Sequence, residues 1–145
     1  MYSTLLDLHS YIAYIVFSIL ILAVINSLMG YFGNKDYTLA KDFRIGLFTL
    51  IFTHIQVTLG FVLYFVSPNG FNAIQTNGMG GLSAFARLLA VEHPFVNILA
   101  VVLITIGWVK HKKEETDKRK FGKIAVFFTI GLVLLLSRLP WAQWL

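Results

Sequence analysis

The chain has 145 residues, of which 57% are hydrophobic and 13% are charged, and its formal net charge is +5. A soluble domain of this size carries about a quarter charged residues, so this chain lacks the polar surface that would cover a water-soluble globule. It contains no cysteine, which excludes disulfides, thiolate metal sites and thiol catalysis.

Four apolar blocks occupy most of the sequence, at about residues 5–29, 45–66, 83–109 (or 92–109) and 122–140. A helix rises about 1.5 Å per residue, so some 20 apolar residues cross the hydrocarbon core of a bilayer. Strands of a membrane barrel would be about 10 residues long and would alternate in polarity, which these blocks do not. The sequence therefore predicts an all-α, integral membrane four-helix bundle, with residues 1–145 forming one transmembrane domain.

The long irregular connection lies between the second and third blocks, at residues 67–81. Its Ser-Pro-Asn-Gly run at 67–70 predicts a turn, and the glycine-rich run at 77–81 predicts a flexible tip. Residues 83–91 allow two interpretations. They form either a short helix at the membrane interface or the first turns of a long third helix that kinks at Pro94.

The basic residues are unevenly divided among the connections. The first connection contains Lys35, Lys41 and Arg44, and residues 110–123 hold seven Lys or Arg, whereas the second connection has only Arg87. Lys and Arg concentrate on the cytoplasmic side, so both basic connections should be cytoplasmic. Both termini should then face the outside, which is the periplasm of a bacterial inner membrane. The positive charge is a signal of topology, and nucleic-acid binding is not expected.

Three histidines lie within the predicted helices, where ionisable side chains are costly and usually functional. His9 is in the first turns of the first helix, His54 is near the middle of the second, and His93 is near the start of the third. All three therefore fall in the outer half or the middle of the bundle. A purely structural histidine, bonded to a carbonyl or a threonine hydroxyl, is the alternative, above all for His9. His111 lies in the basic connection and is expected to be solvated.

A b-type haem suits this arrangement of histidines. Two neutral imidazoles from different helices coordinate the iron, and an apolar slot in the core of a bundle buries the macrocycle. Gly60 could let the porphyrin approach the backbone of the second helix. Arg138 or Arg87 could pair with the propionates.

The two axial ligands must lie at a similar depth in the membrane. His54 with His93 fits if the third helix begins early, near Ser83. His9 becomes the more natural partner of His93 if that helix begins at Glu92. We favour His54 with His93 as the axial pair.

Six short runs are spread over nearly the whole chain, and in order and spacing they resemble a known family. They are Leu8-His9, Phe52-Thr53-His54-Ile55-Gln56, Leu-Gly-Phe-Val-Leu-Tyr at 59–64, Glu92-His93, Ile-Thr-Ile-Gly at 104–107 and Leu139-Pro140-Trp141. The family comprises small four-helix bacterial membrane proteins that are generally labelled cytochrome B. The resemblance implies a haem b held by histidines of the bundle, which His9, His54 and His93 can supply.

We therefore expect a membrane cytochrome with one haem b per chain, which acts as an electron carrier rather than as a stand-alone enzyme. Its surroundings are membrane lipid, and its redox partners would be other membrane redox proteins or a quinone. It could work as a homo-oligomer or as a subunit of a larger complex.

Three other interpretations stay open. An accessory subunit without a redox role would need a protein-facing stripe of small residues, of which the sequence has only a scattering. The membrane-type protoporphyrinogen oxidase also uses a histidine in its first helix and binds porphyrin, but it pairs this histidine with an intramembrane lysine that is missing here. A divalent metal could instead be bound by the three histidines together with Glu92.

Overall fold

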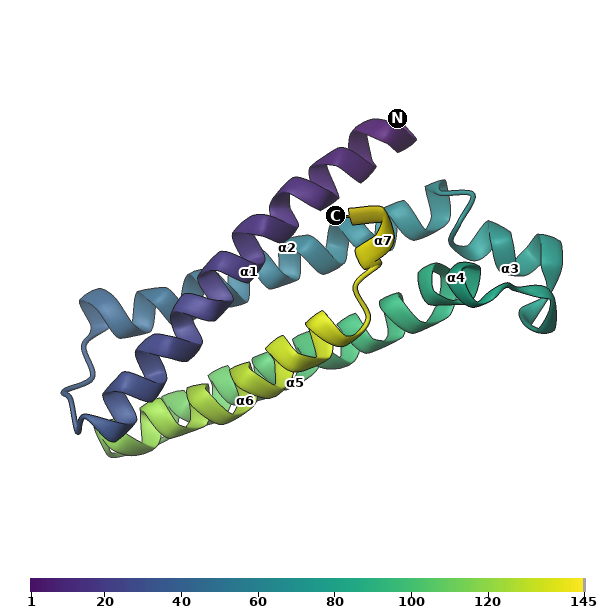
Figure 1. Ribbon diagram of the computed structural model, residues 1–145. Helices are drawn as coiled ribbons and strands as arrows, with labels where there is room; N and C mark the ends of the chain where they lie inside the picture. The colour runs from purple at the N-terminus through teal and green to yellow at the C-terminus, as the bar shows by residue number, and fades with distance from the viewer. Residues whose placement is uncertain (145) are drawn as a thin grey trace.

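The computed structural model describes residues 1–144, and its long elements are all helices (Figure 1). They are α1 (Tyr2–Phe32), α2 (Arg44–Val66), α5 (His93–Lys112) and α6 (Asp117–Ser137). Each belongs to a helical segment that is long and apolar enough to cross a membrane. Continuous helix also satisfies the backbone groups that lipid cannot. The structure confirms the predicted all-α membrane bundle.

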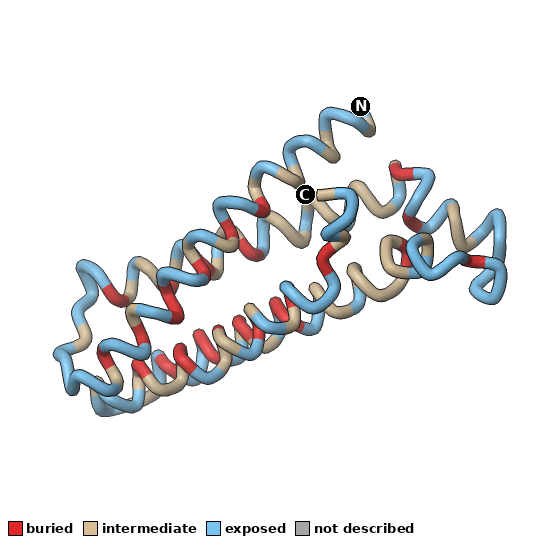
Figure 2. The backbone as a smooth tube through the Cα atoms, in the orientation of Figure 1, coloured by how far each residue is buried: buried red, intermediate tan, exposed pale blue. Residues whose placement is uncertain are grey.

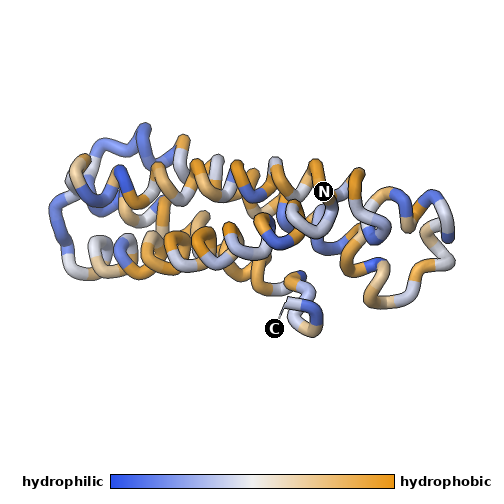
Figure 3. Tube along the Cα trace, turned by 90° about the horizontal axis from the view of Figure 1, so that it is seen from above, coloured by the Kyte–Doolittle hydropathy of each residue, from blue (hydrophilic) through white to orange (hydrophobic). Residues whose placement is uncertain are grey.

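The long helices run alternately up and down, so the bundle has two distinct ends (Figure 1). The terminal end carries the N-terminus, the segment 67–83 and the short helix α7 (Trp141–Trp144). The basic end carries the connection between α1 and α2 and the connection between α5 and α6. Hydrophilic residues gather at the basic end, whereas the helix bodies between the ends are mostly hydrophobic (Figure 3). Which end faces the outside stays a prediction.

Each long helix packs against two others around the bundle. α1 contacts α2 and α6, while α5 contacts α6 and α2, and the seam between α2 and α5 is the least extensive of the four. α1 and α5 therefore lie diagonally opposite each other. Side chains from these two helices can meet only in the interior.

The tightly packed part of the bundle lies in its middle and toward the basic end. Leu20, Ile104 and Phe128 are completely buried there, and buried residues line the facing sides of α1, α5 and α6 (Figure 2). Gly107 packs on Phe127, and a Cβ added at Gly131 would lie 2.6 Å from Ile104 Cγ1. Such close approach at small residues is how membrane helices commonly associate.

The third long helical segment begins early. α4 (Ala84–Arg87) and a π-helical turn, η3 (Leu88–Glu92), lead directly into α5, and the Ser83 hydroxyl caps the start by accepting a hydrogen bond from Ala86 N at 3.1 Å. Residues 83–91 are therefore the first turns of a long helix. The π turn ends two residues before Pro94, whose ring would clash with a carbonyl of the preceding turn in a regular α-helix. The wider turn relieves that clash.

The fourth long helix begins at Asp117, earlier than the predicted start at about residue 122. Thr116 caps it, because its Oγ1 accepts a hydrogen bond from Arg119 N at 3.3 Å, and Asp117 adds a favourable charge to the first turn. The basic stretch 110–123 is therefore mostly helix rather than loop. The remaining short elements are a π turn, η1 (Leu39–Phe43), α3 (Phe71–Asn77) and a 3₁₀ turn, η2 (Met79–Gly81).

Candidate functional site

Two of the three intramembrane histidines meet inside the bundle near its terminal end. His9 comes from α1, and His93 begins α5, the helix diagonally opposite. Their ring centroids are 6.4 Å apart, and their planes are nearly perpendicular, at 80°. Both side chains are partly buried. The two imidazoles are close enough to bind one group between them.

A backbone carbonyl fixes the orientation of His93. Its Nδ1 lies 2.8 Å from the backbone oxygen of Arg138, just beyond α6. A carbonyl only accepts, so Nδ1 carries the hydrogen and Nε2 of the neutral ring presents a lone pair. Asn97, one turn further along α5, places its amide nitrogen 3.1 Å from that Nε2. This is the tautomer in which a histidine binds a metal through Nε2.

Helix α2 supplies the neighbours of His9. The Gln56 amide donates a hydrogen bond to the backbone oxygen of His9 at 2.9 Å, and the same nitrogen lies 3.4 Å from His9 Nε2. One turn further along, a Cβ added at Gly60 would lie 3.1 Å from His9 Cε1. Gly60, which the sequence suggested as the point where a porphyrin approaches the backbone, thus makes room for the histidine ring.

Three buried polar atoms around these rings have no hydrogen-bond partner. They are His9 Nδ1, Gln56 Oε1 and Asn97 Oδ1, and no other buried side-chain atom within residues 1–144 shares this property. Buried polar atoms are nearly always paired, so unpaired ones indicate water or a ligand. We call His9, Gln56, His93 and Asn97 the histidine cluster. Within residues 1–144, this cluster contains all the buried side-chain nitrogen and oxygen atoms that lack a hydrogen-bond partner.

His54 lies in a different part of the bundle. Its side chain is exposed, and its Nε2 lies 3.4 Å from Thr105 Oγ1 on α5. Thr105 is more than three helical turns beyond His93, roughly 18 Å along the axis. The structure therefore does not bring together the axial pair favoured from sequence, His54 with His93. The early start of the third helical segment was expected to match their depths, but His54 lies near the middle of the bundle, whereas His93 lies near the terminal end.

Both arginines proposed for the propionates lie at the terminal end with exposed side chains. Arg138 follows α6, and besides its carbonyl contact with His93 its Nη1 donates a hydrogen bond to Ser137 O at 2.9 Å. Arg87 ends α4, less than two turns before His93. Glu92 is adjacent to His93, but the described residues contain no group of three His, Asp or Glu side chains placed to hold a metal.

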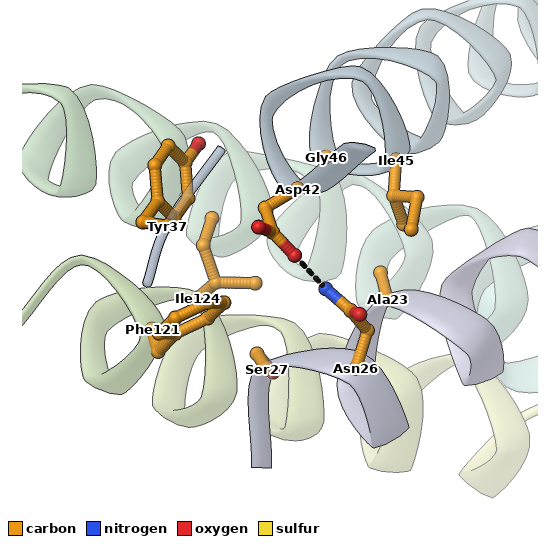
Figure 4. A pocket seen from close by; sticks show the side chains of 9 residues that line it. All are labelled: Ala23, Asn26, Ser27, Tyr37, Asp42, Ile45, Gly46, Phe121 and Ile124. Carbon is orange, nitrogen blue, oxygen red and sulfur yellow. Dashed lines mark hydrogen bonds between the residues drawn. The ribbon is translucent and has the colours of Figure 1, made fainter. Parts of the chain in front are cut away.

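A second polar cluster, which the sequence analysis missed, closes the basic end (Figure 4). Asp42 is only 8% exposed and accepts hydrogen bonds from Asn26 Nδ2 at 2.7 Å and from Thr38 N at 2.8 Å. The hydroxyl of Tyr37 lies 2.7 Å from His111 Nε2. Burial, and secondarily the charge of Asp42, raises the pKa of Tyr37 above its ordinary value. The cavity beside these residues measures about 10 Å³, room for about one water.

The expectation that His111 is solvated was wrong. The residue is 1% exposed, and both ring nitrogens are bonded: Nδ1 donates to Trp108 O at 2.6 Å, and Nε2 accepts from the Tyr37 hydroxyl. The signal was present in the sequence, because Ile104, Trp108 and His111 repeat at the spacing of one helix face. The lysines on either side of His111 made this stretch resemble a solvent-exposed connection.

Comparisons of this chain with protein-family models, with curated proteins and with solved structures give no match. The resemblance to small bacterial cytochrome B proteins therefore gains no support from them.

Proposed function

We propose that the chain is a membrane electron carrier that holds one haem b between His9 and His93. The observation that carries the proposal is the 6.4 Å separation of the two ring centroids. An imidazole nitrogen binds a metal at about 2 Å and lies about 1.1 Å from its ring centroid, so axial imidazoles on the two faces of a haem have centroids about 6 Å apart. The observed separation of 6.4 Å is close to that distance, which supports the proposal.

The bonding of the two rings suits this role. His93 uses Nδ1 to bind Arg138 O, which leaves Nε2 for the iron. His9 Nδ1 is unpaired, and His9 Nε2 has only the Gln56 amide at 3.4 Å. The amides of Gln56 and Asn97, whose nitrogens lie 3.4 and 3.1 Å from the two Nε2 atoms, would have to turn aside for a metal.

The other roles in the proposed electron transfer belong to the haem and to the residues that would hold it. When bound, haem b supplies a reversible one-electron change. His9 and His93 would hold the haem through their imidazole nitrogens. The exposed guanidinium groups of Arg138 and Arg87 lie at the same end and would hold the propionates by charge-assisted hydrogen bonds.

The uneven charge of the two ends supports a location in a bacterial inner membrane, with the basic end in the cytoplasm. The histidine cluster and both termini would then lie toward the periplasm. Electrons would be exchanged with other membrane redox proteins or a quinone, by a single chain, a homo-oligomer or a subunit of a larger complex.

The deciding experiment is an optical spectrum of the detergent-purified protein, expressed with added haem precursor, first oxidised in air and then reduced with dithionite. We expect a sharp reduced α-band of the b type. It should be lost in His9→Ala and His93→Ala and kept in His54→Ala. Added imidazole should restore the band in a variant that folds but lacks one ligand.

Two results would count against this assignment. A band lost in His54→Ala but kept in His9→Ala would reject the ligand pair while keeping the haem. A colourless protein, well folded by circular dichroism and unchanged after incubation with haem, would reject haem binding altogether.

One observation favours a second candidate, a small metal ion at the same place. The amides of Gln56 and Asn97 lie beside the two imidazoles, and each has an unpaired oxygen. With these oxygens turned toward the rings, two nitrogens and two oxygens would form a ligand set. Elemental analysis of the purified, colourless protein tests it. Stoichiometric zinc or another transition metal, lost in His93→Ala, would support the ion.

A further inference from the structure

The haem proposal leaves one intramembrane histidine without a role. His54 lies close to the midpoint of α2, which spans 23 residues, so it is about 15 Å from either end of the helix. Its side chain is exposed on the surface of the bundle, at the seam between α2 and α5. A polar ring that faces lipid at mid-membrane depth is costly, and such residues usually face the bundle interior.

One ring nitrogen of His54, Nε2, lacks a good hydrogen-bond donor. Nδ1 lies 2.7 Å from Leu50 O, so it carries the hydrogen, and Nε2 of the neutral ring is an acceptor. Thr105 has one hydroxyl hydrogen and donates it to Val101 O at 2.7 Å. While that hydrogen is on Val101 O, the longer contact of 3.4 Å between Thr105 Oγ1 and His54 Nε2 has no hydrogen. In this arrangement both atoms are acceptors.

Nothing in the described part of the chain supplies the missing donor. Water is scarce in the hydrocarbon core of a bilayer. An unpaired acceptor in an apolar medium is itself unfavourable. The pair His54 and Thr105, which we call the His54 site, therefore fits an external molecule that brings a hydrogen-bond donor.

The depth and the surroundings of the His54 site restrict that molecule. Lipid headgroups stay at the interfaces, so the donor must belong to a molecule dissolved in the bilayer core. The neighbouring side chains are apolar and partly open: Ile51 is 41% exposed, Ile55 is 40% exposed, and Val102 is 47% exposed. These apolar surfaces suit the apolar part of such a molecule.

We propose that the His54 site binds a hydroquinone, whose hydroxyl donates a hydrogen bond to His54 Nε2. An oxidised quinone has only carbonyl acceptors and cannot donate a hydrogen bond to His54 Nε2, so the site should prefer the reduced form. The choice of a hydroquinone among lipid-soluble donors rests on the proposed electron-carrier function. It names the lipid-soluble partner of that carrier.

The test follows the His54 ring directly. Full-length protein labelled with ¹⁵N-histidine is placed in lipid nanodiscs, and decyl-ubiquinol is titrated in without oxygen. The Nε2 resonance of His54 should shift as the hydroquinone is added. The dimethyl ether of the same hydroquinone, which lacks the hydroxyl hydrogens, should leave it unmoved.

Affinity measurements with variants complete the test. His54→Phe should weaken decyl-ubiquinol binding about tenfold, the effect of losing one good hydrogen bond. Ser18→Ala removes an exposed hydroxyl from α1 and should leave the affinity unchanged.

Three results would overturn the proposal. They are an Nε2 resonance that ignores the hydroquinone, an equal response to the ether, and an unchanged affinity in His54→Phe. A concentration-dependent Nε2 shift without hydroquinone would also overturn it and would assign the donor to a second copy of the chain. The haem spectrum separates this inference from the proposed function, because each readout is independent of the other.

Discussion

The two ends of the bundle both place a histidine among polar side chains from several helices, but they complete the bonding differently. At the basic end, His111 is 1% exposed and both its ring nitrogens are paired, at 2.6 and 2.7 Å. At the terminal end, His9 Nδ1 and two amide oxygens of the histidine cluster are unpaired. A histidine whose two ring nitrogens are both hydrogen-bonded holds helices together and has no atom free for a ligand. A histidine with an unpaired nitrogen can still bind one.

The largest effect should come from disturbing the packed part of the bundle rather than either cluster. In Gly131→Val even the new Cβ would lie 2.6 Å from Ile104, so we expect a loss of about 3 kcal/mol in the free energy of unfolding. Val133→Ala, on the same helix but 59% exposed, should change it little. Thermal unfolding in detergent measures both. Equal midpoints for the two variants would contradict the close contact between α5 and α6.

A smaller loss in the free energy of unfolding should follow when the hydrogen bond between Tyr37 and His111 at the basic end is removed. Tyr37→Phe leaves His111 Nε2 buried without a partner, which should lower the free energy of unfolding by about 1–3 kcal/mol. Tyr11→Phe makes the same change at a side chain that is 69% exposed, and it should be neutral. A neutral Tyr37→Phe would mean that the bond to His111 contributes nothing.

The pH dependence offers a second check on the same residue. Because the folded state raises the pKa of Tyr37, the neutral hydroxyl stabilises the fold fully below the pKa of an unfolded tyrosine, about 10. This stability is lost as the pH rises toward the folded-state pKa. Unfolding midpoints above pH 10 should therefore fall more steeply in the wild type than in Tyr37→Phe. Parallel curves would exclude Tyr37 as the cause.

The smallest effect on stability, and the sharpest probe of the terminal end, is expected for Gly60→Ala. The added methyl group would approach His9 Cε1 to 3.1 Å, so the ring must move by a few tenths of an ångström at a cost below about 1 kcal/mol. Because His9 is the proposed axial ligand, the haem reduction potential and α-band should shift. Gly80→Ala, with nothing within 4 Å, should change neither. A spectrum identical to wild type in Gly60→Ala would argue against ligation by His9.

Much of the fold was predictable because the bilayer imposes a simple rule on the sequence. Apolar blocks long enough to cross the membrane have to be helices, and this rule located all four long helices. The error fell at a helix end, where local bonds decide: the Thr116 cap moved the start of α6 into a basic stretch that resembled a loop. Of the two starts left open for the third helical segment, the structure has the early one, at Ala84.

The sequence by itself determined the membrane bundle, the charge difference between its ends and the presence of three histidines within its membrane-spanning helices. Only the tertiary structure decided which histidines meet. His9 and His93 come from helices that lie diagonally opposite, and the depth of each side chain depends on helix register and the packing of all four helices. The same packing placed His54 on the lipid-facing surface and buried His111 under Tyr37. Hydrogen bonds between distant segments leave no periodic trace in the sequence, so neither polar cluster could be assembled before the helices were placed.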